Sequence, residues 1–387
     1  LCMYDTLSSE EVHLIKTAAA FAAGEIEPHA TDWELQRRVP TETFKAAADA
    51  GLTGLLVPKL LGGRDASHIV VAKVLEELSQ ACLAFTFGLW VHNNLVNVIA
   101  RNGSQHQIDR YLPEMLAGQR VGAFCITEPG TGSDATAIST LAEKVSNGWR
   151  LNGEKAWVTN SVCADVFAVY AQTNPDSGWR GIACFLVDGN VQGLERGVPY
   201  TMSGGHAMGV SGLRIEDILV PETSMLFGPG DGFKAAMKAI NLARTFVAAL
   251  CCGILKASLE AALTYCAGRQ AFGKPILANQ GLQWELADVA TDLEAARLLL
   301  YRAAFALDTG DDAISESAHA KKFASRVAFT GISQCMQAMG AAGLRTDTPL
   351  FRHLATAKMT HYMDGTTEIQ NVVISREILR EHGIRAE

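Results

Sequence analysis

The stretch DVFAVYAQTNPDSGWRGIACFLVD, residues 165–188, decides the fold class of this 387-residue chain. It contains two short runs rich in β-branched and aromatic residues, separated by a loop of Asn, Pro, Asp and Gly. This pattern is typical of two strands joined by a hairpin loop. Similar runs recur at close intervals from 122 to about 228, among them VGAFCIT, GWRLNGEKAWVT and LRIEDILVP. We therefore expect an antiparallel β-domain over residues 122–228.

The segments on either side of this β region carry apolar residues at helical spacing. The first, residues 1–121, opens with Ser8 and Ser9 ahead of an acidic turn, which is a helix-start signal. The second, residues 229–387, begins with the long apolar run GFKAAMKAINLARTFVAAL. The order helical, β, helical argues against a parallel sheet built from βαβ units. The chain is expected to be an α+β protein with these three domains.

Composition excludes several classes of function. Apolar residues make up 48% of the chain, and a net charge of −8 is spread without long runs, so we expect no nucleic-acid partner. We find no leader-like start and no uninterrupted apolar segment of membrane-spanning length, and therefore expect a cytoplasmic protein without membrane insertion. The nine cysteines form no CxxC pair and are expected to be reduced and buried. No metal-ligand spacing occurs, so no metal site is expected.

The segment GTGSDA, residues 130–135, fits the dinucleotide fingerprint GxGxxA. Its context does not fit, because Pro129 precedes it and short strands follow it instead of a crossover helix. Nicotinamide binding is therefore the weaker interpretation. Free backbone N–H groups and two hydroxyls in this stretch favour binding of a phosphate or a ring carbonyl, although an ordinary β-turn also accounts for it.

A carboxylate, Asp364, lies where two helical segments meet in HYMDGTTEIQNVVISREIL, residues 361–379. Gly365 is expected to end the preceding helix, and Thr367 with Gln370 to form a capping box for the next one. The plain interpretation is a helix stop followed by a helix start. The alternative is a turn that directs an acid into a pocket.

Three further motifs are weak when taken singly. In WVTN, residues 157–160, an aromatic ring and a hydroxyl fall on the same side of an expected strand. RQAFGKPI, residues 269–276, combines an arginine and an aromatic residue at the end of a long helix, which suits a polyphosphate or adenine contact or a salt bridge. In QAMGAAGLR, residues 337–345, two glycines in a helical region favour close approach of a helix or a ligand.

Together these motifs resemble the acyl-CoA dehydrogenases, and they occur in the order found in that family. The resemblance extends over essentially the whole chain. It rests on TEPGTGSD at 127–134, NGEKAWVTNS at 152–161, VP at 220–221, YCAGRQAFGKPI at 265–276 with Gln280, QAMGAAG at 337–343 and DGTTEIQ at 364–370.

The resemblance implies an N-terminal α-helical domain, a central antiparallel β-barrel and a C-terminal four-helix-bundle domain, with FAD held between barrel and bundle. It implies that six residues line the flavin within one chain: Thr127, Ser133, Trp157, Thr159, Thr366 and Glu368. It further implies that five residues reach FAD across a subunit interface in a homotetramer built as a dimer of dimers: Arg269, Phe272, Gln280, Gln337 and Gly340.

The resemblance also implies a reaction. A carboxylate, here Asp364, removes the α-proton of an acyl thioester while the β-hydride passes to flavin N5, and an electron-transfer flavoprotein takes the electrons. Such a carboxylate needs a pKa raised by desolvation. Ser133, Arg244 and Gly365 are implied as substrate contacts. Whether coenzyme A or an acyl carrier protein carries the acyl group stays open.

The sequence departs from the family at the base, where most members have glutamate in place of Asp364. A misplacement of about 1 Å can cost on the order of 10²-fold in rate. Another branch carries its base immediately before the arginine that matches Arg244, but Ala243 stands there. Three interpretations follow: Asp364 is the base; it serves an unusual substrate, as in nitroalkane oxidases, whose arginine seven positions later is Asn371 here; or the protein is a catalytically impaired flavoprotein scaffold.

Overall fold

The computed structural model describes residues 7–384, which begin with a layer of helices. Ser8 is the N-cap of the first helix and its side chain accepts a hydrogen bond from the Glu11 N–H, as the helix-start signal predicted. The N-terminal helices are α1 (Ser9–Phe21), α2 (Ala30–Gln36), α3 (Thr41–Asp49), α4 (His68–Ala81), α5 (Leu83–Asn102) and α6 (Gln105–Leu116), with a π-helical turn at Ala22–Ile26.

Eight strands follow and form one sheet in the order β6-β7-β3-β2-β4-β5-β8, with β1 beside β4. The hairpin predicted over 165–188 is confirmed, because β4 and β5 pair antiparallel with Val166 opposite Asp188. The strands are β1 (Gly122–Cys125), β2 (Leu141–Val145), β3 (Gly148–Val158), β4 (Val166–Gln172), β5 (Ile182–Asp188), β6 (Leu194–Arg196), β7 (Ser211–Val220) and β8 (Met225–Phe227).

The sheet is not wholly antiparallel, so that part of the prediction is wrong. Strand β1 pairs β4 in parallel, and β2 meets β4 in parallel at Leu141 and Gln172. The β2–β3 hairpin lies between β1 and β4 in the chain, and this long connection lets both strands run in the same direction. Among residues 7–384 no pairing joins the end strands β6 and β8, so the expected closed barrel is not confirmed.

Strand β4 is buried along its whole length because both of its faces are covered. Val166, Ala168 and Tyr170 pack in a core shared with helices α5 and α6. The alternate residues Phe167 and Val169 pack in a second core, between strands of the sheet. This position accounts for the near-continuous apolar sequence of the strand.

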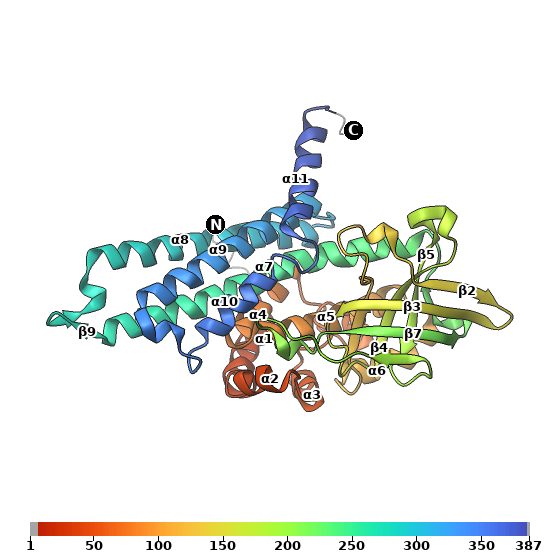
Figure 1. Cartoon of the computed structure of the whole chain (residues 1–387), viewed down its shortest axis with the longest axis horizontal. Coiled ribbons are helices and arrows are strands. Elements are labelled where there is room, and N and C mark those ends of the chain that lie inside the picture. The colour runs from red at the N-terminus through yellow and green to blue at the C-terminus, as the bar shows by residue number, and fades with distance from the viewer. Residues whose placement is uncertain (1–6, 385–387) are drawn as a thin grey trace.

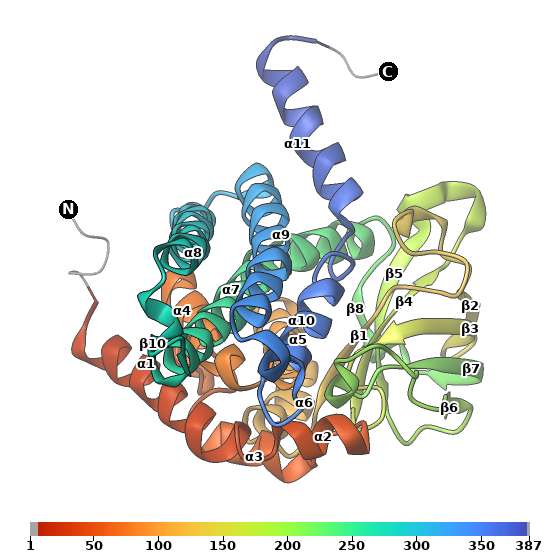
Figure 2. The same ribbon diagram turned by 60° about the vertical axis from the view of Figure 1, so that its left-hand side comes forward.

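Helices return after the sheet and form the other half of the molecule (Figures 1 and 2). Helices α7, α8 and α9 pack side by side, α10 packs on α7 and α9, and α11 projects away from the body. The elements are α7 (Asp231–Gly268), the short hairpin β9 (Gln270–Ala271) and β10 (Lys274–Pro275), α8 (Gln280–Asp308), α9 (Ile314–Ala338), α10 (Leu350–Met359) and α11 (Thr367–Glu381).

Two helices, α5 and α7, are long and apolar enough to span a membrane by length and composition, which the sequence analysis did not anticipate. In both helices most of the apolar window is buried inside the protein, 78% for α5 and 72% for α7. Their apolar surface is therefore used by the protein core.

The prediction of unpaired cysteines is confirmed for the described part of the chain. Eight of the cysteines are free there, and all of these except Cys163 are buried. Cys2 lies outside the described residues.

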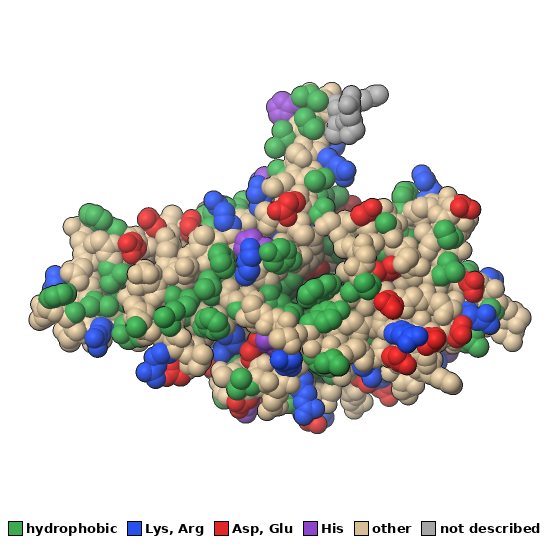
Figure 3. All heavy atoms as spheres, in the orientation of Figure 1, with side chains coloured by type: hydrophobic (Ala, Val, Ile, Leu, Met, Phe, Trp, Pro, Cys, Tyr) green, Lys and Arg blue, Asp and Glu red, His purple; other side chains and the backbone are tan. Residues whose placement is uncertain are grey.

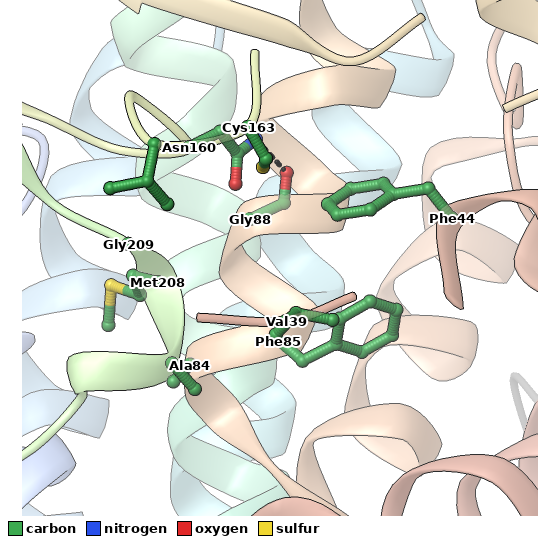
Figure 4. Close-up of a pocket in the computed structure, with 11 residues that line it drawn as sticks. Val39, Phe44, Ala84, Phe85, Gly88, Asn160, Cys163, Met208 and Gly209 are labelled. Carbon is green, nitrogen blue, oxygen red and sulfur yellow. Dashed lines mark hydrogen bonds between the residues drawn. The ribbon is translucent and has the colours of Figure 1, made fainter. Parts of the chain in front are cut away.

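Asn160 fastens the loop after β3 to helix α5 (Figure 4). Its side-chain Nδ2 donates to the Gly88 carbonyl at 2.9 Å and to the Gly122 carbonyl at 3.1 Å. A cavity of about 10 Å³ lies beside this contact, room for about one water molecule. A Cβ atom at Gly88 would lie 2.6 Å from Asn160 Oδ1, so only glycine fits there. Thr159 lies in this loop, and Trp157 lies near the end of β3 just before it.

Gly88→Ala tests this contact. Alanine has a higher helix propensity than glycine. However, its Cβ would clash with Asn160, which two hydrogen bonds hold in place, and this clash should lower the free energy of unfolding by about 1–3 kcal/mol. Urea unfolding measures this difference. The control is Gly24→Ala, where a Cβ meets nothing within 4 Å; equal stability of the two variants would contradict the assignment.

Candidate active site

Asp364 and Gly365 lie in a left-handed turn between α10 and α11, with φ of +50° and +96°. The helix before the turn ends at Met359, earlier than the sequence predicted. Thr366, with extended backbone angles, is the N-cap of α11, and its Oγ1 accepts from the Ile369 N–H at 3.3 Å. The predicted N-cap at Thr367 is therefore wrong by one residue, and the predicted capping box with Gln370 does not form, because Ile369 stands three residues after Thr366.

Two cationic side chains hold the carbonyl groups of this turn. Arg244 on α7, 9% exposed, donates from Nε to the Asp364 carbonyl at 3.0 Å. Lys321 on α9 is fully buried and donates from Nζ to the Gly365 carbonyl at 2.6 Å and the His361 carbonyl at 3.3 Å. The sequence analysis missed Lys321. The feature of the sequence that could have identified Lys321 is its position on the helix. It lies four residues after Ser317 and three before Ala324, on the same buried face.

The surroundings of the Asp364 carboxylate change its pKa. Its Oδ2 atom is covered and has no hydrogen-bond partner within residues 7–384. Burial raises the pKa of Asp364, the positive charges of Lys321 and Arg244 act against burial, and the resulting pKa is about 6. A carboxylate with a pKa near the working pH is suited to act as a general base.

A buried ion pair joins the two segments that were expected to line the flavin. Lys155 Nζ on β3 lies 2.8 Å from Glu128 Oε1, and both side chains are buried. Glu128 also accepts from the Ser139 N–H at 2.6 Å and the Thr140 N–H at 2.9 Å. Burial alone would raise the pKa of Glu128, but the charge and hydrogen bond of Lys155 outweigh it and lower the pKa to about 2. The segments 127–134 and 152–159 are thus fixed together.

Residues of the segments 127–134 and 152–159 form an exposed surface with polar and aromatic side chains. Trp157 is 61% exposed, has φ of +57°, and its ring centroid lies 4.7 Å from that of Tyr200. A register shift between Lys155 and Val158 turns this residue, so its direction arises from a bulge and not from strand alternation. Ser133 is exposed, while Thr127 and Thr159 are half-buried. This donor set, with an exposed indole, fits a planar cofactor such as a flavin.

The remaining candidates divide into two groups. Thr366 and Gly365 belong to the turn itself, and Glu368 lies exposed in the first turn of α11. The other five residues lie at the end of helices α7, α8 and α9 that is far from the sheet, near β9 (Figure 1). At this end α7 and α9 meet, and the Cys266 thiol contacts the Ala338 carbonyl. All five are exposed, and the structure does not bring them to Asp364 within one chain: Arg269, Phe272, Gln280, Gln337 and Gly340.

Comparison with known families and proteins covers nearly the whole chain. Residues 8–119, 123–218 and 230–379 match, respectively, the N-terminal, middle and C-terminal domains described as acyl-CoA dehydrogenase. An acyl-CoA dehydrogenase of Bacillus subtilis is 37% identical over 96% of this chain and 99% of its own length. The mouse mitochondrial short-chain specific acyl-CoA dehydrogenase is 36% identical over 98% of this chain and 93% of its own.

Several solved structures are similar to this chain over nearly its whole length. Butyryl-CoA dehydrogenase from Megasphaera elsdenii superposes with a TM-score of 0.94 at 31% identity, over 98% of this chain and 100% of its own. A chain from work on the electron transferring flavoprotein of Acidaminococcus fermentans gives 0.94 at 33% identity over 98% and 100%. PigA with FAD and proline gives 0.92 at 30% over 99% and 100%. The chain belongs to the acyl-CoA dehydrogenase family, whose members are FAD-dependent oxidoreductases that act on CH–CH groups.

Proposed function

We propose that this protein dehydrogenates an acyl thioester between its α and β carbons, with Asp364 as the base. The observation that carries this proposal is the covered, unpartnered Oδ2 of Asp364 in a left-handed turn, with a pKa of about 6. The names of the related proteins, among them the short-chain specific and butyryl-CoA dehydrogenases, support an acyl-CoA as substrate.

In this mechanism Asp364 removes the α-proton and keeps it on its carboxyl group. Within residues 7–384 the N–H groups of Asp364 and Gly365 bond to no backbone carbonyl, so both can donate to the thioester carbonyl and stabilise its developing negative charge. FAD, when bound, supplies the acceptor for the β-hydride. Ser133 and Arg244 are proposed to orient the substrate.

The left-handed turn supports aspartate as a functional base. Aspartate and asparagine tolerate a positive φ better than most residues, because their short polar side chains bond locally. Asp364, with φ of +50°, is therefore compatible with its backbone. This favours the first of the three interpretations over a degraded site.

FAD is proposed to bind between two copies of the chain. Thr127, Ser133, Trp157, Thr159, Thr366 and Glu368 would come from one copy, and Arg269, Phe272, Gln280, Gln337 and Gly340 from a partner subunit. Large apolar side chains are exposed on α8 and α11, the kind of surface that a homotetramer covers: Trp284, Leu298, Phe305, Val372 and Ile378. Apolar side chains are also visible over the helical half in Figure 3.

An electron-transfer flavoprotein is the proposed electron acceptor, in keeping with the solved chain from work on such a protein. A second candidate is a flavin oxidase that acts on a non-thioester or carrier-bound acid. The similar structure described as PigA with FAD and proline favours that candidate. Rapid reaction of the reduced flavin with oxygen distinguishes the oxidase from the dehydrogenase.

Asp364→Asn tests the base. In an anaerobic titration with a panel of acyl-CoA thioesters, we expect the wild type to lose its visible flavin absorbance. The variant should bind FAD but react about 10²–10⁴-fold more slowly, because it lacks a proton acceptor. Glu381→Gln removes an exposed carboxylate at the end of α11 and serves as the control. Equal bleaching rates in Asp364→Asn and the control would refute the assignment.

The pH dependence provides a separate test. Because the ionised carboxylate is the active form, the rate of flavin reduction should rise with pH around a midpoint of about 6. Stopped-flow reduction under single-turnover conditions measures this midpoint. A midpoint near the ordinary value for aspartate, 3.8, would contradict the burial of this group.

Lys155→Met tests the fixed flavin segments. It leaves Glu128 buried without its cation, which should cost about 3–5 kcal/mol of unfolding free energy and weaken FAD binding. The control is Lys144→Met on β2, whose side chain is 54% exposed; it should change stability by about 1 kcal/mol or less. Denaturant unfolding compares the two. Similar losses in both variants would show that the buried pair does not fix the segments.

A further inference from the structure

The side chain of Lys321 is fully buried, and its two hydrogen bonds to carbonyl groups do not by themselves account for a lysine at this position. The Gly365 carbonyl also accepts from Gln370 Nε2 at 2.9 Å, and the His361 carbonyl from the Thr367 N–H at 3.0 Å. Both acceptors are therefore satisfied without the lysine. Within residues 7–384 its ammonium group donates to these two carbonyls and forms no ion pair with a carboxylate. A buried ammonium with so little direct compensation has a large desolvation cost, and satisfying these carbonyls does not explain it.

The charged and titratable groups around Lys321 come from three elements. Arg244 and Cys251 lie on α7, His361 and Asp364 on the turn, and Glu368 on α11. Burial lowers the pKa of Lys321 to about 8, and the strongest influence in the opposite direction is the charge of Asp364. Lys321 is in turn the charge that acts most strongly against the burial of Asp364. The two groups are thus linked through space, in addition to the carbonyl bonds.

We propose that Lys321 is a positioning residue for the base: its ammonium holds the 361–365 turn in the left-handed form and stabilises the charged form of the Asp364 carboxylate. This inference rests on the proposed role of Asp364. Arg244 does not duplicate Lys321, because it binds a different carbonyl, that of Asp364 itself.

A consequence distinguishes this role from simple packing. A guanidinium keeps its charge over the working pH range, whereas the Lys321 ammonium loses its proton around pH 8. Above that pH the turn loses one of its two cations, and the charged carboxylate loses its stabilising neighbour. The wild-type rate should therefore fall again above about pH 8, giving a bell-shaped profile.

The test compares Lys321→Met with Lys322→Met, a change at the exposed neighbouring lysine of the same helix. Steady-state kinetics of the FAD-loaded enzyme should show kcat lowered by about 10²-fold in Lys321→Met with little change in KM. The acid limb of its pH profile should move to higher pH and the limb near pH 8 should disappear. Lys322→Met should keep the wild-type profile. Lys321→Gln, which keeps an amide donor but no charge, should behave like Lys321→Met and provides a second variant should the methionine protein not fold.

An infrared titration, taken as the difference between each protein and its Asp364→Asn partner, measures the carboxyl group without substrate. A higher midpoint in Lys321→Met or Lys321→Gln than in Lys322→Met supports the proposal. An unchanged midpoint, or lower stability with an unchanged pH profile, overturns it. The proposed dehydrogenation fails separately, if Asp364→Asn still allows flavin reduction by an acyl thioester.

Discussion

The site depends on two buried cations that share one turn of the backbone. Arg244 comes from α7 and Lys321 from α9, and each donates to a peptide carbonyl beside the acid. Because these carbonyl groups belong to the backbone of Asp364 and Gly365, the two bonds fix the backbone position from which the Asp364 side chain extends. The helices α7 and α9 pack against each other along much of their length, so the rigidity of the bundle is transmitted to the carboxylate.

A second buried interaction, between Lys155 and Glu128, holds the backbone at the proposed flavin end. Lys155 and Glu128 are separated in sequence by the whole of β2 and the glycine-rich loop, yet the pair lies inside the protein at 2.8 Å. Pairs of this kind contribute less to stability than to a defined geometry, since their removal together with hydrophobic replacement is often tolerated. Both ends of the site thus use buried charge to define backbone position, while the sheet and the bundle supply the stability.

The sequence predicts the regular parts of this structure better than the connections between them. The β4–β5 hairpin and the Ser8 N-cap follow from local pattern and are confirmed. The parallel pairing of β1 with β4 depends on contacts between distant segments, which no local pattern contains. At the turn, Thr366 and Thr367 are equally good caps by residue type, and the structure has the extended backbone and the capping hydrogen bond at Thr366. Lys321 was missed because a lysine in a helix ordinarily points to water.

The separation of the proposed flavin contacts into two groups, at opposite ends of the helices, has a consequence for the behaviour of the protein in solution. When a cofactor is bound by residues of two subunits, its binding and the association of the subunits are thermodynamically linked, and each strengthens the other. Under the proposed assignment, the apparent affinity for FAD then depends on protein concentration. Dilution would release cofactor without any change in a single chain, and saturating FAD would draw dilute chains together.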